Sequence, residues 1–284
     1  MSLKGIAKQT LEILDQGSYV GPSGTTIHLK KEVKAAVQGT KLYTPDQLAQ
    51  LLDAPATGSG VPIIEVTDET TQRAARRLVQ DEGVSDLVLL NFASARNAGG
   101  GFLKGAKAQE EDVTRCSGLY PCLLTQPTYY QVNRQTKSLL YTDHMIYSPA
   151  VPWFRVESRS LIDEPFLASV ITAPAPNAGK VLRRNNTAHP EIEACLRRRA
   201  GMVLALAQAE GHRTLLLGAW GCGVFRNDST MVADAFGTWL SDTRFAGAFD
   251  RVIFAILDRT KMRHTLHAFE NRFSSEANGI NALP

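Results

Sequence analysis

Three consecutive glycines followed by a polar and acidic triplet are the part of this sequence best suited to chemistry. The glycines are Gly99, Gly100 and Gly101. After seven further residues come Gln109, Glu110 and Glu111. Residues without a Cβ let backbone N–H groups approach an anion or a sugar closely, and they adopt positive φ angles freely. The glycine segment therefore predicts a nucleotide-like ligand, the alternative being a flexible turn with no ligand.

The two adjacent glutamates are predicted to have different roles in the site. If Glu110 and Glu111 begin a helix, neighbouring side chains leave it about 100° apart, so we expect the two carboxylates to act separately. One would hold sugar hydroxyls, while the other would donate a proton to a glycosidic oxygen, with its pKa raised by burial. The alternative is that both acids only favour the positive end of the helix dipole.

A second loop with glycines lies between a predicted strand and a predicted helix. Its residues are Gly221, Cys222, Gly223, Val224 and Phe225. Backbone amides that precede a helix N-terminus bind phosphate, so this loop predicts a diphosphate contact, with Phe225 against a ribose or a base. The alternative is that Phe225 belongs to the core. Cys222 is expected to be a small buried residue, because no convergent Cys, His and Asp set indicates thiol catalysis.

The elements that must position these loops are predicted from apolar runs. Five continuous runs indicate strands buried on both faces, at residues 62–66, 86–92, 168–173, 214–220 and 251–257. Helical patterns cover residues 70–81, 190–211, 231–240 and 262–273. The alternation predicts an α/β fold with a mixed, mainly parallel sheet between helices, and it places the glycine segment at the carboxyl end of a strand.

The N-terminal region is expected to be a helical extension over residues 1–58, which need not be a separate domain, followed by the main domain over residues 59–284. Helices are predicted near residues 6–14 and 45–52, and residues 54–60 are typical of a connector. Between residues 112 and 165 the pattern predicts one helix, near residues 112–119, followed by loops rich in Tyr, Pro and Gln.

Composition excludes several classes of protein. Of the 284 residues, 44% are apolar and 21% charged, which is typical of a globular protein rather than a disordered or collagen-like one. The net charge of +3 is too small to require a nucleic-acid or membrane partner. Four cysteines without metal-like spacing and acidic residues near the start indicate a reduced, cytoplasmic protein. The six histidines form no ligand set, so no metal is expected.

Two basic runs have different expected roles. Arg183 and Arg184 are expected in a loop, where they could meet phosphate, whereas Arg197, Arg198 and Arg199 are expected on a solvated helix face.

The glycine triplet, the Gln-Glu-Glu triplet seven residues later, and the stretches FASARNAGGG, SGLYPCL and GCGVF resemble poly(ADP-ribose) glycohydrolases of the short bacterial branch. The likeness covers most of residues 60–260. It implies a macrodomain-like catalytic domain over residues 59–284, no cofactor, and hydrolysis of the ribose–ribose O-glycosidic bonds of poly(ADP-ribose) to release ADP-ribose. The implied partners are poly(ADP-ribose) or ADP-ribosylated proteins, without direct nucleic-acid or membrane binding.

The same resemblance assigns roles to individual residues. It implies that Glu111 is the general acid, that Glu110 binds sugar hydroxyls and that Gln109 supports the loop. It places the glycine triplet at the distal ribose and diphosphate, and makes Asn97 a ribose contact. The loop over residues 221–225 would wrap the diphosphate, with Phe225 against the distal ribose, and residues 173–177 are a position-based suggestion for the adenine pocket. A hydrolase of single ADP-ribose groups and a non-catalytic ADP-ribose reader remain alternatives, although a reader has no need of the acids.

Overall fold

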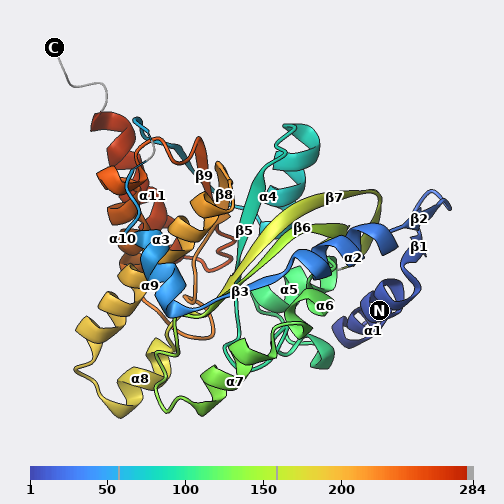
Figure 1. Ribbon diagram of the computed structural model, residues 1–284, viewed down its shortest axis with the longest axis horizontal. Helices are drawn as coiled ribbons and strands as arrows, with labels where there is room; N and C mark the ends of the chain where they lie inside the picture. The colour runs from blue at the N-terminus through green and yellow to red at the C-terminus, as the bar shows by residue number, and fades with distance from the viewer. Residues whose placement is uncertain (57, 158, 280–284) are drawn as a thin grey trace. The chain divides into compact units, whose positions relative to one another are not determined.

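The computed structural model describes residues 1–279 apart from residues 57 and 158, without the side chains of residues 275–279. The chain divides into two compact units (Figure 1). The first comprises Met1–Thr44, Thr71–Lys137 and Thr142–Pro174, and the second comprises Pro45–Thr70, Ser138–Tyr141 and the residues from Ala175 onward. Among the helices that the structure describes, none has the length and apolar character that a membrane-spanning helix needs.

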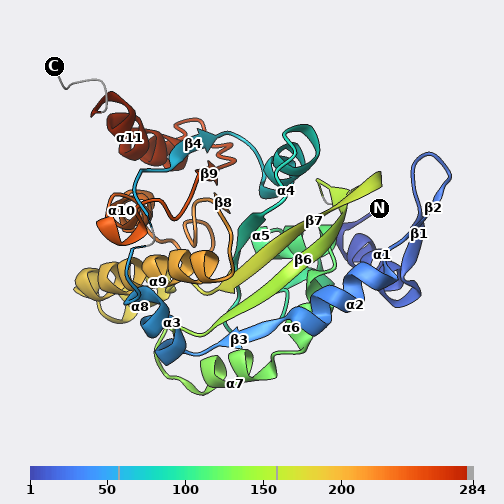
Figure 2. The ribbon, with the colours of Figure 1, turned by 45° about the horizontal axis from the view of Figure 1, so that its top comes forward.

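Four strands of the first unit lie in the order β3, β6, β7, β5. Their bounds are β3 Lys41–Tyr43, β5 Leu87–Phe92, β6 Met145–Val156 and β7 Ser160–Ala173. Strand β5 is buried along most of its length and pairs in parallel with the end of β7, whereas β6 pairs antiparallel with both β3 and β7. Figure 2 shows β7, β6 and β3 side by side, with α2 (Lys30–Gly39) along β6.

Short helices surround these strands. They are α1 (Leu3–Gln16), α4 (Thr71–Arg76) with a π-helical continuation (Arg77–Asp81), the 3₁₀ turn η2 (Phe102–Lys104), α5 (Gln109–Cys116), α6 (Leu119–Leu124) and α7 (Pro127–Gln135). A hairpin of β1 (Ser18–Val20) and β2 (Thr26–His28) follows α1. Helix α1 packs on η2 and α5, and the buried Thr10 hydroxyl donates a hydrogen bond to the Arg115 carbonyl at 2.8 Å. The N-terminal helix therefore supports the segment that follows the glycine triplet.

The second unit contains three parallel strands in the order β8 (Thr214–Leu217), β9 (Arg251–Ala255), β4 (Ile63–Thr67). Its helices are α3 (Pro45–Leu52), α8 (Ala178–Arg184), α9 (His189–Ala209), α10 (Ser229–Leu240) and α11 (His264–Gly279), with a 3₁₀ turn η3 (Thr243–Phe245). Aromatic rings form much of the core, since Phe236 contacts Trp220 and Phe254, and Phe254 contacts Phe269, at centroid distances of 5.3–6.1 Å.

The predicted fold class is confirmed. Apart from the separate β1–β2 hairpin, the parallel pairs β5–β7, β8–β9 and β4–β9 outnumber the antiparallel pairs β3–β6 and β6–β7 within the two units. In the N-terminal region α1 and α3 match the predicted helices, and α2 and three short strands accompany them. The domain boundary at residue 58 stays a prediction. The expectation that Arg199 lies on a solvated face is wrong, because its side chain is fully buried and donates a hydrogen bond to the Leu140 carbonyl at 3.0 Å.

Candidate active site

The glycine triplet begins the candidate site at the end of β5. After the strand, the Ser94 hydroxyl accepts hydrogen bonds from the backbone N–H groups of Arg96 and Asn97, at 3.3 and 3.2 Å, and folds the chain back on itself. Gly99 and Gly100 then adopt left-handed backbone conformations with φ of 66° and 59°. Such angles favour glycine, which accounts for two of the three glycines.

Close contact with the acidic side chains gives Gly100 a second reason to be glycine. A Cβ at this position would lie 2.4 Å from Glu111 Oε1 and 2.8 Å from Glu110 Oε2. Both carboxylates therefore lie against the same backbone, although neighbouring helical side chains leave the helix in different directions. The two carboxylates accept hydrogen bonds from different backbone groups, as expected for separate roles. Both nevertheless lie against Gly100.

Glu110 is buried almost completely, with 2% of its surface exposed. Its Oε2 accepts a hydrogen bond from the Ser94 backbone N–H at 2.7 Å, and its Oε1 accepts a long one from Asn91 Nδ2 at 3.5 Å. Burial raises the pKa of Glu110 well above its ordinary value, and the negative charge of Glu111 raises it further. The neutral form of this carboxyl is therefore favoured.

Replacing Glu110 with Gln should make the stability of the protein less dependent on pH. The folded-state pKa lies above the ordinary 4.5, so the folded state binds the Glu110 proton more tightly than the unfolded state. Stability that this proton provides is fully present below pH 4.5 and is lost as the pH rises toward the folded-state pKa. Gln cannot ionise, so the variant's unfolding free energy relative to wild type should increase from pH 4.5 to 8.5.

Urea unfolding across that range measures this difference directly, and Glu12→Gln on the exposed face of α1 is the matched control. The control difference should stay constant with pH. A flat or falling curve for Glu110→Gln contradicts the burial argument.

Glu111 has one anchored carboxylate oxygen and one that accepts no hydrogen bond. The Gly101 backbone N–H donates to Oε1 at 2.8 Å. Oε2 is buried and has no hydrogen-bond partner among the described residues. Buried polar atoms are nearly always paired, so this oxygen keeps an acceptor position for a bound water or ligand.

Gln109 fixes the first turn of α5 against β5. Its side-chain amide donates to the Leu90 carbonyl and accepts from the Phe92 N–H, both at 2.9 Å. The side-chain amide of Gln109 thus makes the two hydrogen bonds to β5 that the backbone of an adjacent strand would make. This contact sets the acidic first turn of α5 at the carboxyl end of β5.

Arg115 fixes the same helix from its other end. Its guanidinium is fully buried, donates to the Ala106 carbonyl at 2.8 Å and forms an ion pair with Asp112. Ala106 belongs to the segment between the glycine triplet and α5, so Arg115 ties that segment to the helix that carries the acids. The sequence gives no local signal for this role, because it depends on burial.

The second loop is held closed within the second unit. Gly221 has a φ of 74°, and a Cβ there would lie 2.4 Å from Asn227 Nδ2 and 2.5 Å from Ala175 Cβ. Asn227 is buried and donates to the carbonyls of Pro176 and Gly221, at 2.9 and 3.1 Å. Asn227 is thus a residue of the site that sequence reasoning missed. A polar side chain directly before a predicted helix was its only signal.

The remaining residues of the second loop differ in exposure. Val224 is 78% exposed and Gly223 is also exposed. Phe225 is half-buried, and its ring lies 6.0 Å from that of Tyr141, so it is not a core residue. Cys222 is only partly buried, which differs from the expected buried residue, although desolvation raises the pKa of its thiol to about 12 and keeps it protonated.

The structure therefore brings together the glycine triplet, Gln109, Glu110 and Glu111 in the first unit, and it places the loop over residues 221–225 in the second. Asn97 donates its backbone N–H to Ser94, and its carbonyl accepts from Gly100, while the residue itself is exposed. Sequence reasoning missed the contribution of Ser94 and of Asn91, a buried amide at the end of an otherwise apolar strand.

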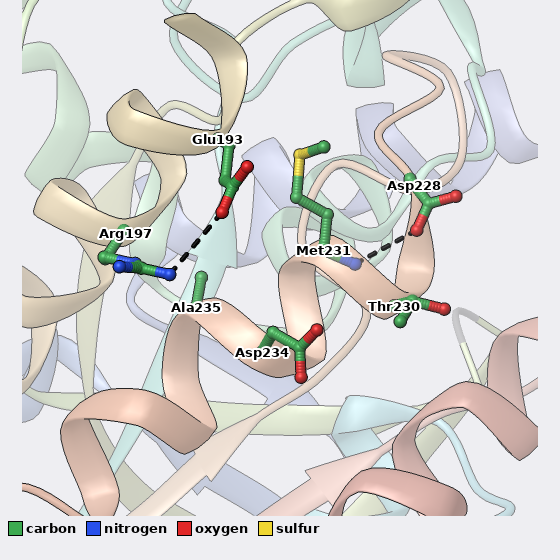
Figure 3. Close-up of a pocket in the computed structure, with 7 residues that line it drawn as sticks. All are labelled: Glu193, Arg197, Asp228, Thr230, Met231, Asp234 and Ala235. Carbon is green, nitrogen blue, oxygen red and sulfur yellow. Dashed lines mark hydrogen bonds and ion pairs between the residues drawn. The ribbon is translucent and has the colours of Figure 1, made fainter. Parts of the chain in front are cut away.

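A separate cavity of about 260 Å³ opens in the second unit between α9 and α10 (Figure 3). It is lined by Glu193, Arg197, Asp228, Thr230, Met231, Asp234 and Ala235. Three carboxylates and one guanidinium line it, and that guanidinium pairs with Glu193 at 3.5 Å. The charge of this cavity is unfavourable for a diphosphate, so the candidate site rests on the loops.

Comparisons with known proteins point to one family. The family model for the microbial-type PARG catalytic domain matches residues 7–156. The crystal structure of poly(ADP-ribose) glycohydrolase (PARG) from Thermomonospora curvata is 45% identical, with 95% of this chain and 99% of that chain covered and a TM-score of 0.91. The same enzyme bound to the inhibitor ADP-HPD gives a TM-score of 0.88 at the same identity and coverage.

PARG from Deinococcus radiodurans in complex with ADP-ribose is 46% identical, covers 88% of this chain and 99% of that chain, and has a TM-score of 0.81. A comparison with curated protein sequences gives no match.

Proposed function

This chain belongs to the microbial-type poly(ADP-ribose) glycohydrolase family, which makes it a glycosidase, and we propose that Glu111 is the acid that cleaves its ribose–ribose bond. The observation that carries this proposal is the buried, unpartnered Oε2 of Glu111 beside the Gly100 backbone. Because Oε1 is held by the Gly101 N–H, the free oxygen has a fixed direction. An acid held in this way meets the geometric requirement for proton transfer to a bound ligand.

The reaction proceeds through an oxocarbenium-like transition state at the anomeric carbon. Glu111 gives its proton to the glycosidic oxygen as the bond from that oxygen to the anomeric carbon breaks. Water then adds to the anomeric carbon, and its proton returns to the Glu111 carboxylate or passes to a phosphate of the substrate. The departing chain leaves with a ribose hydroxyl, and ADP-ribose is released.

Glu110 binds hydroxyls of the reacting ribose in this proposal. Each carboxylate oxygen has two lone pairs, so the bonds from Ser94 and Asn91 leave capacity for a sugar. Two adjacent carboxyl groups against one glycine are difficult to ionise together, and the raised pKa of Glu110 supports a pair that retains one proton.

The loops bind the rest of ADP-ribose. The backbone of the glycine triplet borders the distal ribose and diphosphate, and Asn97 contacts a ribose. Residues 221–225 wrap the diphosphate, with Phe225 against the distal ribose. Fixed geometry supports these assignments, because Asn227 closes the second loop and the Phe225 carbonyl accepts from the Gly179 N–H at 2.9 Å. ADP-ribose is the ligand in the Deinococcus radiodurans enzyme.

The state of the cysteines supports a proposal about the cellular compartment in which the protein acts. Among the residues that the structure describes, Cys116, Cys122, Cys195 and Cys222 form no disulfide. Disulfides are rare in the reducing cytosol, so reduced cysteines fit the cytoplasm as the proposed place of action.

Hydrolysis of polymer should be separable from hydrolysis of single ADP-ribose groups. Defined poly(ADP-ribose) and mono-ADP-ribosylated protein are incubated separately with wild type, and the products are resolved by chromatography. We expect the polymer to yield ADP-ribose while the singly modified protein keeps its label. Release from the singly modified protein at a comparable rate supports the mono-ADP-ribosyl hydrolase instead. Unchanged polymer together with tight ADP-ribose binding supports a non-catalytic reader.

A further inference from the structure

Four cationic residues of the second unit belong to α8 or directly follow Phe225, and the proposed mechanism uses none of them. Lys180, Arg183 and Arg184 belong to α8, and Arg226 follows Phe225 directly. All four are exposed. Arg183 and Arg184 end a helix, which corrects the expectation that they lie in a loop.

Gly179 connects these cations to the second loop. Its N–H donates to the Phe225 carbonyl at 2.9 Å, and its own carbonyl accepts from Arg183 Nε at 3.0 Å. A Cβ on Gly179 would lie 3.0–3.4 Å from the Cβ, Cγ and Cδ atoms of Arg226. Arg183 and Arg226 therefore meet at a residue that is bonded to the loop itself.

These cations lack the acidic partners that several other arginines of the chain possess. Ion pairs form at Arg73, Arg77, Arg115, Arg197, Arg213, Arg251, Arg263 and Arg272. Within the part of the chain that the structure describes, no such pair forms at Arg183, Arg184, Arg226 or Lys180. The acid nearest in the chain to Arg226 is Asp228, whose Oδ1 accepts from the Met231 N–H as the cap of α10. The positive charge of the cluster is therefore not neutralised by neighbouring side chains.

Arg226 also has a backbone conformation that an arginine does not favour. Its φ is 57°, in the left-handed region, where glycine is the favoured residue. Its N–H donates to the Gly223 carbonyl at 3.1 Å, which holds the turn in this conformation. A strained non-glycine residue at a ligand loop suggests that the side chain itself has a use there.

We infer that Arg183 and Arg226, supported by Lys180 and Arg184, form a subsite for polymer phosphates outside the ADP-ribose unit being cleaved. The inference rests on the proposed role of residues 221–225 in holding the diphosphate of that unit. Every neighbouring unit of the polymer carries a further diphosphate. Guanidinium groups bind phosphate oxygens with paired hydrogen bonds, and clustered cations attract an extended polyanion. The subsite favours long chains over short ones.

The test compares Arg226→Gly and the double variant Arg183→Ala/Arg226→Gly with wild type. Glycine suits the backbone angle at residue 226, so Arg226→Gly should melt at or above the wild-type temperature, and the double variant, which also loses the exposed Arg183–Gly179 hydrogen bond, should stay folded at the assay temperature. The control, Lys31→Ala/Lys34→Ala, removes the same number of exposed cations from α2, in the first unit. Initial rates are measured on long poly(ADP-ribose) and on the ADP-ribose dimer, which has a single cleavable bond.

For the double variant we expect kcat/KM on long chains to fall about 10-fold at low salt, and the slope of log(kcat/KM) against log[salt] to become shallower by about 1 to 2. Dimer hydrolysis and ADP-ribose affinity should match the control. An equal loss on dimer and polymer, or an unchanged salt slope, overturns the subsite. If wild type leaves the polymer intact, the proposed function is wrong. If wild type cleaves the polymer and the double variant behaves in the same way, only the subsite is wrong.

Discussion

Replacing Glu111 with Gln is expected to lower kcat on poly(ADP-ribose) by about 10²- to 10⁴-fold, the usual range for removal of a general acid. Gln keeps an oxygen that can accept from the Gly101 N–H, so the loop should retain its shape. It offers no acidic proton to the departing ribose. The affinity for ADP-ribose, measured by calorimetry, should stay close to that of wild type.

Single-turnover hydrolysis separates this effect from slow product release. The matched control is Glu193→Gln, which changes a carboxylate of the acidic cavity in the second unit. That control should leave turnover unchanged, since the cavity has no part in the mechanism. Turnover of Glu111→Gln within threefold of wild type contradicts the assignment of the acid, by the usual size of such effects.

Replacing Gly100 with Ala is expected to reduce kcat by about 10²-fold or more, because it displaces both carboxylates at once. The new Cβ would lie 2.4 Å from Glu111 Oε1 and 2.8 Å from Glu110 Oε2, distances that no real contact tolerates. The left-handed φ of 59° adds backbone strain of about 1–3 kcal/mol. Steady-state kinetics and urea unfolding together measure the two consequences.

The control Gly24→Ala separates the effect of backbone strain from the effect of a steric clash between the new Cβ and the carboxylates. Gly24 has a φ of 85° in the β1–β2 hairpin, and a Cβ there would meet nothing within 4 Å. The control should therefore lose comparable stability while kcat stays at the wild-type value. Wild-type kcat in Gly100→Ala shows that the reaction does not need both acids against this backbone, and it removes the basis of the proposed geometry.

The strands that carry the loops were predictable because burial on both faces leaves a local trace. The apolar run over residues 86–92 corresponds to β5, Leu87–Phe92, and the runs over residues 214–220 and 251–257 contain β8 and β9. Helix α9, His189–Ala209, agrees with the prediction over residues 190–211, and the residues from 199 to 207 are buried. A helix of this length bounded by Pro190 and Gly211 has signals at both ends.

The segment over residues 112–165 was not predictable in the same way. It contains α6, α7 and the twelve-residue strand β6, which includes Pro149 and Pro152 and an irregular register between Ser148 and Val151. Prolines interrupt the pattern by which a strand is recognised, and helices of six to nine residues depend on tertiary packing more than on their own sequence. These elements form because distant strands and helices cover them.

In the candidate site, too, local features were predictable from the sequence and contacts between distant residues were not. The types and spacing of the glycines and acids predicted a candidate set of residues, since that information is local, and their functional roles stay predictions. The contacts that orient them join residues far apart in the sequence, as with Thr10 and Arg115, or require knowledge of burial, as with Asn227. The convergence of both acids on Gly100 is a property of the folded loop and could not be inferred from helical geometry alone.

The central claim is that the glycine triplet holds the anomeric carbon of the distal ribose beside Glu111. A crystal structure of Glu111→Gln with bound ADP-ribose dimer tests it most directly. The account predicts a glycosidic oxygen within about 3.5 Å of the side-chain amide at residue 111, with the ribose hydroxyls at Glu110. A dimer bound away from residues 99–101, or side chains at residues 110 and 111 that both face solvent, would contradict the account.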